Sequence, residues 1–182
     1  MVRIAVGGSG KSVGKTSLIC SLIGAMPERQ WTAIKITSHV YGKAEPIWEE
    51  TAAGEATDTE RYLAAGARRA LLVEAPHAEI GFAALERALR NDENLLFESN
   101  AIVESTPLDL CLAVIGGPGT EAKPSFAKVL GRADACVTFA AREAGAIDAD
   151  STKPVFRLSG FNMLSPEMLG WLRGKLDSAK AS

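Results

Sequence analysis

The sequence is poor in residues that would cross-link a small fold or hold a metal ion. It contains two histidines and three cysteines, and Cys20, Cys111 and Cys136 lie far apart inside apolar runs. An odd number of cysteines in such runs is typical of buried core thiols, and no Cys/His pair has zinc-site spacing. We therefore expect neither a disulfide framework nor a structural zinc.

The sequence also lacks an excess of charge of one sign and any long apolar run. Lys and Arg number 20 against 22 Asp and Glu, a net charge of -2, so no nucleic-acid partner is predicted. No run approaches the roughly 20 residues of a membrane helix, and the chain begins on a strand-like segment without a signal-peptide pattern. These observations predict no membrane partner, a cytoplasmic location and a single domain over residues 1–182.

Strand-like and helix-like segments alternate along the chain. Strands are predicted at 2–6, 31–37, 70–74, 95–98, 108–115, 135–139 and 155–158, and helices at 16–26, 56–67, 80–90 and 165–176. Most of the strands are apolar throughout, which is typical of a parallel sheet covered by helices on both faces. The pattern predicts an α/β fold with a three-layer, doubly wound, mostly parallel sheet.

A glycine-rich stretch, GGSGKSVGKTS, connects the first predicted strand to the first predicted helix. It fits the Walker A pattern G-x-x-x-x-G-K-[ST], whose backbone N–H groups surround a phosphate. Choosing Lys15 as the phosphate lysine leaves a full strand before the loop, whereas choosing Lys11 would cut that strand to about four residues. The predicted nucleotide-binding residues are Ser9, Gly10, Lys11, Ser12, Val13, Gly14, Lys15, Thr16 and Ser17.

Two positions of this loop leave alternatives open. Ser9 stands where the pattern has its first glycine, so either the loop differs in shape there or Gly8 makes the turn with one residue inserted. Lys11 either contacts a phosphate, in its own chain or across a dimer interface, or is a solvated loop lysine.

A P-loop protein also needs an acid that holds magnesium through water and orients the nucleophile. Glu74 and Glu98 each end an apolar strand, whereas Asp109 begins one. Ligands gather at the carboxyl ends of parallel strands, so Asp109 lies at the wrong end. Spacing alone does not choose between the two glutamates.

Four segments in a fixed order carry a family resemblance: the loop, AIKITSH with Lys35, DTERYLAAGA and LLFESN. Over about residues 2–105 the chain resembles the molybdopterin-guanine dinucleotide biosynthesis protein B family. That family has a P-loop, a lysine-bearing second strand followed by Thr and His, a D-[ST]-x-R-x-x-x-A-G-A segment and a strand ending in V-E-G. The resemblance implies a P-loop NTPase fold, Mg²⁺ with GTP or ATP, a homodimer and a possible protein partner in cofactor maturation.

Matching positions also implies roles for individual residues. Gly14, Lys15 and Thr16 correspond to the phosphate and magnesium site, and Glu98 corresponds to the acid of V-E-G. Lys15 and Glu98 are thereby the expected catalytic residues, and Thr16 and Glu98 the expected metal-side residues.

Lys35, His39, Asp58 and Arg61 match the family's second and third segments and are the candidates for a substrate or second site. The sequence departs from the family where one histidine of the K-H-T-H-H stretch remains and where serine replaces the glycine of V-E-G. Asp58 and Arg61 can equally form an i,i+3 ion pair on a helix, and His39 can be a loop histidine bonded to backbone.

Three functions are compatible with these residues. The first is Mg-dependent GTP or ATP binding with slow hydrolysis, as an accessory factor in molybdenum cofactor biosynthesis. The second is a P-loop small-molecule kinase whose acceptor pocket lies between residues 37 and 61, and the third is a nucleotide-dependent switch without turnover. The sequence contains no N-K-x-D stretch, so guanine is implied by the resemblance alone.

Overall fold

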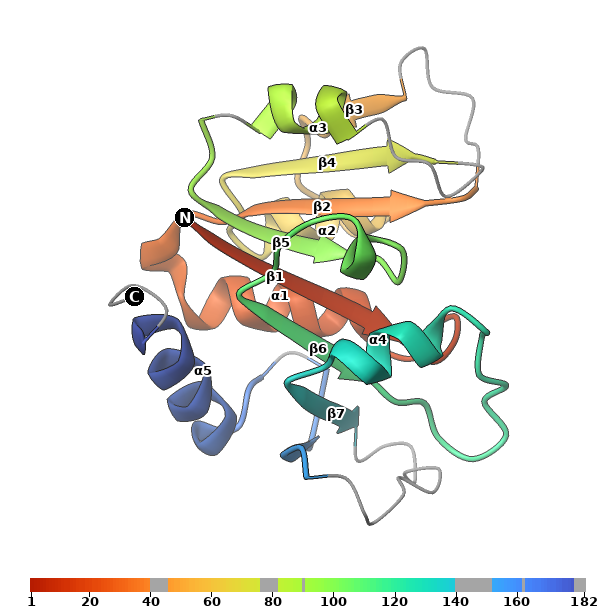
Figure 1. Cartoon of the computed structure of the whole chain (residues 1–182). Coiled ribbons are helices and arrows are strands. Elements are labelled where there is room, and N and C mark those ends of the chain that lie inside the picture. The colour runs from red at the N-terminus through yellow and green to blue at the C-terminus, as the bar shows by residue number, and fades with distance from the viewer. Residues whose placement is uncertain (40–45, 76–81, 90, 140–151, 162, 179–182) are drawn as a thin grey trace.

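An eight-stranded sheet forms the centre of the molecule (Figure 1). The computed structural model describes residues 1–39, 46–75, 82–89, 91–139, 152–161 and 163–178. The strands are β1 (Val2–Gly8), β2 (Thr32–Thr37), β3 (Ile47–Glu49), β4 (Arg69–Glu74), β5 (Asn94–Glu98), β6 (Leu110–Val114), β7 (Ala135–Phe139) and β8 (Val155–Leu158). The helices are α1 (Lys15–Ala25), α2 (Asp58–Ala64), α3 (Phe82–Leu89), α4 (Phe126–Arg132) and α5 (Pro166–Ser178), with 3-10 turns η1 (Pro27–Arg29) and η2 (Ile102–Glu104).

The strand order places β1 inside the sheet. The order is β3-β4-β2-β5-β1-β6-β7-β8, and every described pair is parallel except β3 with β4. After β1 the chain moves toward one edge of the sheet through β2 and β4, then returns through β5 and continues to the other edge. Because the crossovers are right-handed, the connection that follows β1 lies on one face of the sheet and the connection that follows β5 lies on the other face. A crevice results at the carboxyl end of β1.

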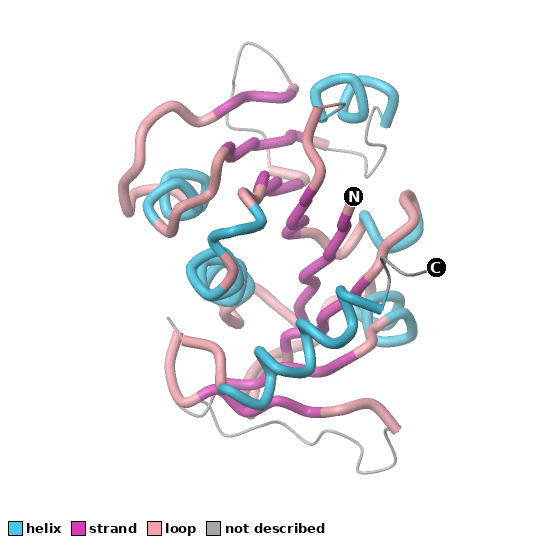
Figure 2. Tube along the Cα trace, turned by 90° about the vertical axis from the view of Figure 1, so that its left-hand side faces the viewer, coloured by secondary structure: helices cyan, strands magenta, loops and turns pink. Residues whose placement is uncertain are grey.

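Two apolar cores lie on the two faces of the sheet, and helices flank both sides (Figure 2). Side chains of α1, α2 and α5 pack in one core, and those of α3, η2 and α4 pack in the other. Within β6, Leu110, Leu112 and Val114 join the first core, while Cys111 and Ala113 join the second. This alternation is the period of two that a strand buried on both faces requires.

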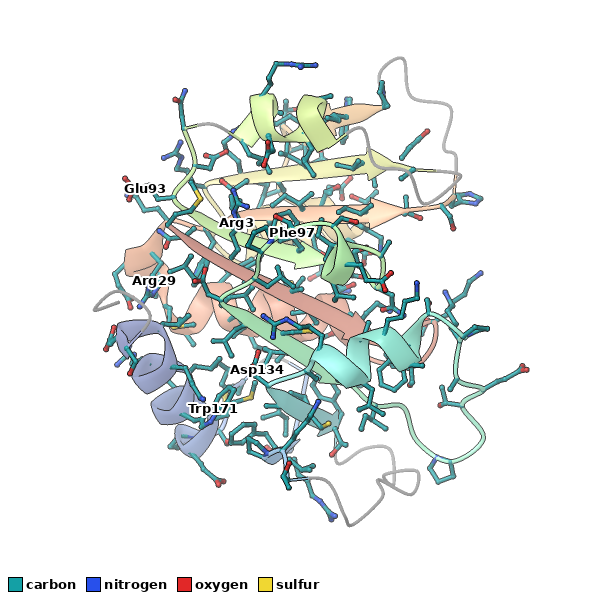
Figure 3. The ribbon with its side chains drawn as sticks, viewed as in Figure 1. Arg3, Arg29, Glu93, Phe97, Asp134 and Trp171 are labelled. Carbon is teal, nitrogen blue, oxygen red and sulfur yellow. The ribbon has the colours of Figure 1, made fainter. Side chains whose placement is uncertain are left out.

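Phe97 and Trp171 illustrate the two layers (Figure 3). Phe97 of β5 is buried in the α3 and α4 core, whereas Trp171 of α5 packs against the opposite core and lies 5.3 Å, centroid to centroid, from Phe156. Trp31 is fully buried, and its indole N–H donates to the Met26 carbonyl.

The predicted fold class is confirmed, with two omissions. The edge strand β3 and the helix α4 were not predicted from the sequence. Both are short, three and seven residues, and their patterns are too brief to show a period. The three cysteines are free thiols, and burial raises the pKa of Cys20 and Cys111 to about 11. In the described part of the chain, no helix is long and apolar enough to cross a membrane.

Candidate functional site

An open cleft of about 850 Å³ lies at the carboxyl edge of the sheet. Its walls come from the loop after β1, the ends of β2 and β5, the first turns of α1 and α2, and the segments before α4 and α5. Among its described lining residues, Lys11, Lys15, Lys35, Arg61 and Lys123 oppose only two carboxylates. The cleft therefore carries a positive charge within a chain whose net charge is -2, which favours an anionic ligand.

The loop from Ser9 to Gly14 has backbone geometry that needs glycine at its end. Gly14 has φ 109°, and a Cβ added there would overlap the Phe139 ring. Helix α1 begins at the next residue, and no side chain caps its first turn, so those N–H groups remain available to a ligand. The Lys15 ammonium folds back over the loop and donates to the Gly10 carbonyl at 3.0 Å.

Ser9 is accommodated without a positive φ. Its hydroxyl oxygen accepts a 2.9 Å hydrogen bond from the Gly116 N–H, and its own N–H donates to the Val114 carbonyl at 2.9 Å. The Lys123 N–H donates to the Ser9 carbonyl at 2.8 Å. The serine therefore joins the loop to β6 and to the segment before α4. Gly8 remains the last residue of β1, so no inserted turn is needed.

Glu98 is a buried carboxylate at the centre of this site. It ends β5, which pairs directly with β1, and its side chain is 6% exposed. The Thr16 hydroxyl donates to Glu98 Oε2 at 2.8 Å, the Tyr62 hydroxyl donates to the same oxygen, and Lys35 Nζ lies 3.3 Å from Oε1. Burial, followed by the negative charge of Glu98, raises the pKa of Tyr62. Tyr62 therefore stays a neutral donor.

Lys35 connects Glu98 to a second carboxylate, Asp58, with which it forms an ion pair. Burial alone would lower the pKa of Lys35, but the charges of Glu98 and Asp58 outweigh it and raise the value. Burial would likewise raise the pKa of Asp58, but the hydrogen bond and charge of Lys35 lower it. Both groups are therefore held in their charged forms.

Arg61 extends this network onto α2. Its Nη1 lies 3.8 Å from Asp58 Oδ1, and its Nη2 donates to the Ser17 hydroxyl at 3.3 Å. The i,i+3 ion pair expected on the helix is therefore present, and it faces the cleft rather than bulk solvent alone. An ion pair on the helix and a position in a second site are therefore compatible for Asp58 and Arg61.

The structure also places the remaining predicted residues. Lys11 and Ser12 are exposed on the rim of the cleft. His39 lines the cleft after β2, and its backbone N–H donates to the Thr37 hydroxyl at 3.1 Å. Glu74 ends β4, which β2 and β5 separate from β1, and it does not line the cleft. Asp109 lies just before the amino end of β6, as expected, and its carboxylate accepts a hydrogen bond from the backbone N–H of Arg3.

Several residues that line the cleft were not predicted from the sequence. Asn100, two residues after Glu98, accepts from the Gly8 N–H at 2.8 Å and donates to the Gly8 carbonyl at 3.0 Å and to the Ser125 hydroxyl at 3.1 Å. Lys123 contributes positive charge from the segment before α4. Asn100 could have been predicted, because it closely follows a strand at the edge where ligands bind. Nothing in the sequence around Lys123 indicated that it would line the cleft.

The residues fit a phosphate-bound magnesium ion better than a protein-only metal site. Among the described residues, no group of three His, Cys, Asp or Glu side chains is arranged to hold a metal. Mg²⁺ is usually held by one or two protein oxygens together with phosphate and water. Thr16 lies in the first turn of α1, and its hydroxyl is hydrogen-bonded to buried Glu98. This hydroxyl oxygen matches the donor set that Mg²⁺ uses.

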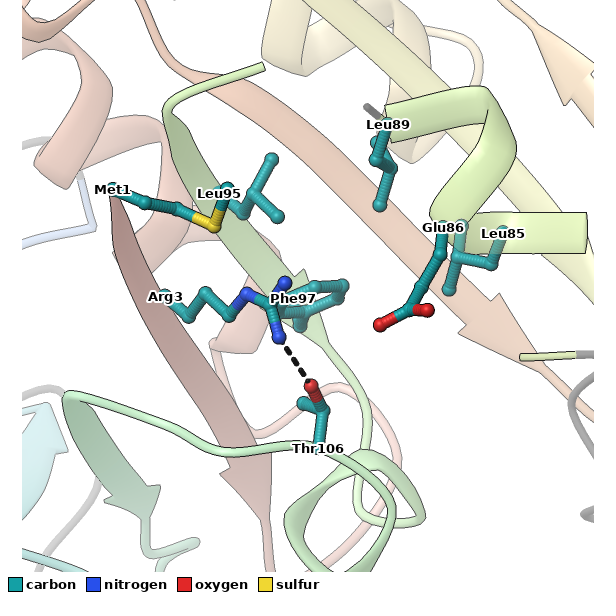
Figure 4. A pocket seen from close by; sticks show the side chains of 8 residues that line it. All are labelled: Met1, Arg3, Leu85, Glu86, Leu89, Leu95, Phe97 and Thr106. Carbon is teal, nitrogen blue, oxygen red and sulfur yellow. Dashed lines mark hydrogen bonds between the residues drawn. The ribbon is translucent and has the colours of Figure 1, made fainter. Parts of the chain in front are cut away.

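A second cavity, of about 50 Å³, lies at the opposite end of β1 (Figure 4). Met1, Leu85, Leu95 and Phe97 line it, and the Arg3 guanidinium crosses it to donate to the Thr106 hydroxyl at 2.9 Å. A cavity of this size is smaller than ordinary ligand sites. The larger cleft is therefore the candidate functional site.

Comparisons with known proteins agree with this geometry at the level of the fold. No protein-family profile matches the chain, and no curated protein sequence matches it. The fold is similar to the crystal structure of LpxK from Aquifex aeolicus in complex with ATP, with a TM-score of 0.52 and 17% identity. The match covers 86% of this chain and 53% of LpxK, so the chain spans about half the length of that protein. This likeness supports the three-layer, mostly parallel α/β fold, and the narrower resemblance to molybdopterin-guanine dinucleotide biosynthesis protein B is not confirmed.

Proposed function

We propose that the chain binds a nucleoside triphosphate, ATP or GTP, with Mg²⁺ and acts on its terminal phosphate. The observation that carries the proposal is the meeting of Lys15, Thr16 and buried Glu98 in a positively charged cleft at the carboxyl edge of β1. Support also comes from LpxK, a protein of similar fold whose crystal structure is a complex with ATP.

Each group has a distinct role in this proposal. The uncapped first turn of α1 and the loop N–H groups bind the phosphate oxygens. The Lys15 ammonium moves from the Gly10 carbonyl to the β- and γ-phosphates, a charge-assisted contact stronger than the one it leaves. Burial lowers the pKa of Lys15, the largest effect on it, and a phosphate would counter that effect.

Thr16 and Glu98 would hold the metal side of the site. Mg²⁺, when bound, supplies positive charge that neutralises the developing charge on the transferred phosphoryl group. Thr16 offers its hydroxyl oxygen, and Glu98 fixes that hydroxyl and acts through water. Lys35 and Tyr62 keep the Glu98 carboxylate in place, so catalysis consists mainly of positioning and charge stabilisation.

Hydrolysis by water is the first candidate reaction. The second is phosphoryl transfer to a small acceptor, favoured by the extent of the cleft beyond the loop. The cleft continues past Glu98 to the end of β2 and to α2, where His39 and Arg61 line it. A volume of about 850 Å³ is near the upper end for small-molecule sites, which leaves space for an acceptor beside the nucleotide. A switch without turnover would bind nucleotide but would neither release phosphate nor transfer it to an acceptor.

The two overlapping lysine motifs give a matched pair of variants. Calorimetry with Mg²⁺ and ATP, GTP or CTP should show binding to the unaltered chain. Lys15→Ala should weaken it about 10- to 100-fold, the loss expected for charge-assisted hydrogen bonds. Lys11→Ala, at an exposed position, should weaken it far less. Binding by Lys15→Ala as tight as that of the unaltered chain would contradict the proposal.

Product analysis separates the candidate reactions. Phosphate released without an added acceptor indicates hydrolysis, whereas rapid transfer to a metabolite in a screen indicates a kinase. A role in molybdenum cofactor maturation, the homodimer and a protein partner stay predictions, for which light scattering and co-purification are the measurements.

A further inference from the structure

We infer that Phe161 is the stacking platform for the nucleobase of the bound nucleotide. The inference rests on the proposed function and adds to it the subsite that holds the part of the ligand distal to the phosphates. A large aromatic side chain lies on the wall of this positively charged cleft.

Phe161 is unusual among the exposed side chains. It is 37% exposed, and among the large apolar side chains exposed in the described part of the chain it alone lines the cleft. The others are Met1, Leu130, Val155 and Met163. It is also the one Phe, Tyr or Trp among the described residues of the cleft wall. A partly exposed aromatic side chain beside a phosphate-binding loop suits a flat heteroaromatic ring.

The Phe161 ring is held at a fixed place relative to the loop. It packs on Phe139, with centroids 4.7 Å apart and planes tilted by 33°. Phe139 is buried and lies against Gly14, the residue that precedes Lys15. The Ser21 hydroxyl lies 3.2 Å from the Phe161 carbonyl and 2.9 Å from that of Ser17. Contacts from β7 and α1 therefore fix the platform, although Phe161 itself lies in a loop.

The direction of the phosphate chain leads toward this ring. The Walker A lysine contacts the β- and γ-phosphates, and the helix start contacts the α- and β-phosphates. Thr16, the expected Mg²⁺ ligand, bonds to Glu98 at the end of β5, so the γ-phosphate end would lie on that side of β1. Phe161 follows β8, on the other side of β1, and lies close to Ser21 one turn beyond Ser17. A nucleoside leaving the first turn of α1 away from Glu98 meets the Phe161 face.

The test separates base binding from phosphate binding. Calorimetry with Mg²⁺ would compare ATP, GTP and inorganic tripolyphosphate on the unaltered chain, Phe161→Ala, Phe161→Trp and Met163→Ala. Met163→Ala is the matched control because Met163 is an exposed apolar residue close in sequence that does not line the cleft. Thermal unfolding of each variant verifies that it is folded.

The expected result is selective. Phe161→Ala should weaken the binding of ATP and GTP about tenfold or more and leave the affinity for tripolyphosphate unchanged, because stacking acts on the base alone. Phe161→Trp should retain ATP binding, and Met163→Ala should match the unaltered chain. Equal losses for ATP and tripolyphosphate, or no loss for either, would overturn this inference. If Phe161→Ala binds ATP normally while Lys15→Ala does not, the stacking inference fails and the proposed function stands.

Discussion

Replacing Gly14 with alanine tests whether the loop conformation depends on the absence of a side chain. Gly14 precedes α1 and has φ 109°, a backbone conformation that L side chains rarely adopt. A Cβ there would also overlap the buried Phe139 ring. The substitution therefore combines a backbone penalty with a steric one.

Both penalties have known ranges. A non-glycine residue in a sparsely populated φ/ψ region costs about 1–3 kcal/mol, and overpacking a filled core costs about 1–3 kcal/mol. Gly14→Ala should therefore lower the free energy of unfolding by about 2–6 kcal/mol, a large part of the 5–15 kcal/mol of a typical domain. Because Phe139 supports Phe161, the variant should also weaken ATP binding more than tripolyphosphate binding.

Gly24, in the last turn of α1, supplies the matched control. It is exposed, and a Cβ built on it has no heavy atom within 4 Å. Gly24→Ala should therefore stabilise the protein by up to about 1 kcal/mol through helix propensity. Urea unfolding followed by circular dichroism measures both variants, and thermal midpoints should move about 2–4 °C per kcal/mol.

A double-mutant cycle with Phe139→Leu separates the two penalties. Because a smaller side chain relieves the overlap but not the φ penalty, Gly14→Ala with Phe139→Leu should be less destabilised than the sum of the single variants. A cost below about 1 kcal/mol for Gly14→Ala would refute the reasoning, since either penalty alone should exceed it.

Three further predictions concern hydrogen bonds and pH. Tyr62→Phe removes a donor from buried Glu98 and should cost about 1.5–3 kcal/mol in urea unfolding; an unchanged midpoint would contradict the role assigned to that hydroxyl. Ser9→Ala leaves the Gly116 N–H without its acceptor and should cost about 1–3 kcal/mol, whereas a neutral result would show that water replaces the serine. The pKa of Asp58 is lowered from 3.8, so its stabilisation is present above that pH and lost as pH falls through the folded value. Asp58→Asn should therefore reduce stability at neutral pH and show a smaller loss on acidification below about pH 4; parallel pH curves would contradict this.

The parallel sheet and its loop were predictable because their signals are local. Continuous apolar runs indicated strands buried on both faces, and the alternation in β6 between two cores confirms that interpretation. Likewise, GKT between a predicted strand and a predicted helix indicated a loop before the first turn of α1, where Lys15 and Thr16 lie.

The choice of the acidic residue was not local. Glu74 and Glu98 both end apolar strands, and only the strand order places β5 beside β1 and β4 two strands farther away. Thr16 and Glu98 are 82 positions apart in the sequence but share a hydrogen bond. The family resemblance favoured Glu98; spacing alone contained no information on which strand would be adjacent.

The sequence by itself determined the α/β class, the start of α1 after a phosphate-loop pattern, and the residue types able to bind an anion, because these depend on short-range periodicity and backbone preference. Only the tertiary structure decided that Glu98, Lys35, Asn100, Lys123 and Phe161 line one cleft. These residues come from strands and loops distant in the sequence. Their proximity follows from the order in which parallel strands pack to bury both faces of the sheet, a property of the whole chain.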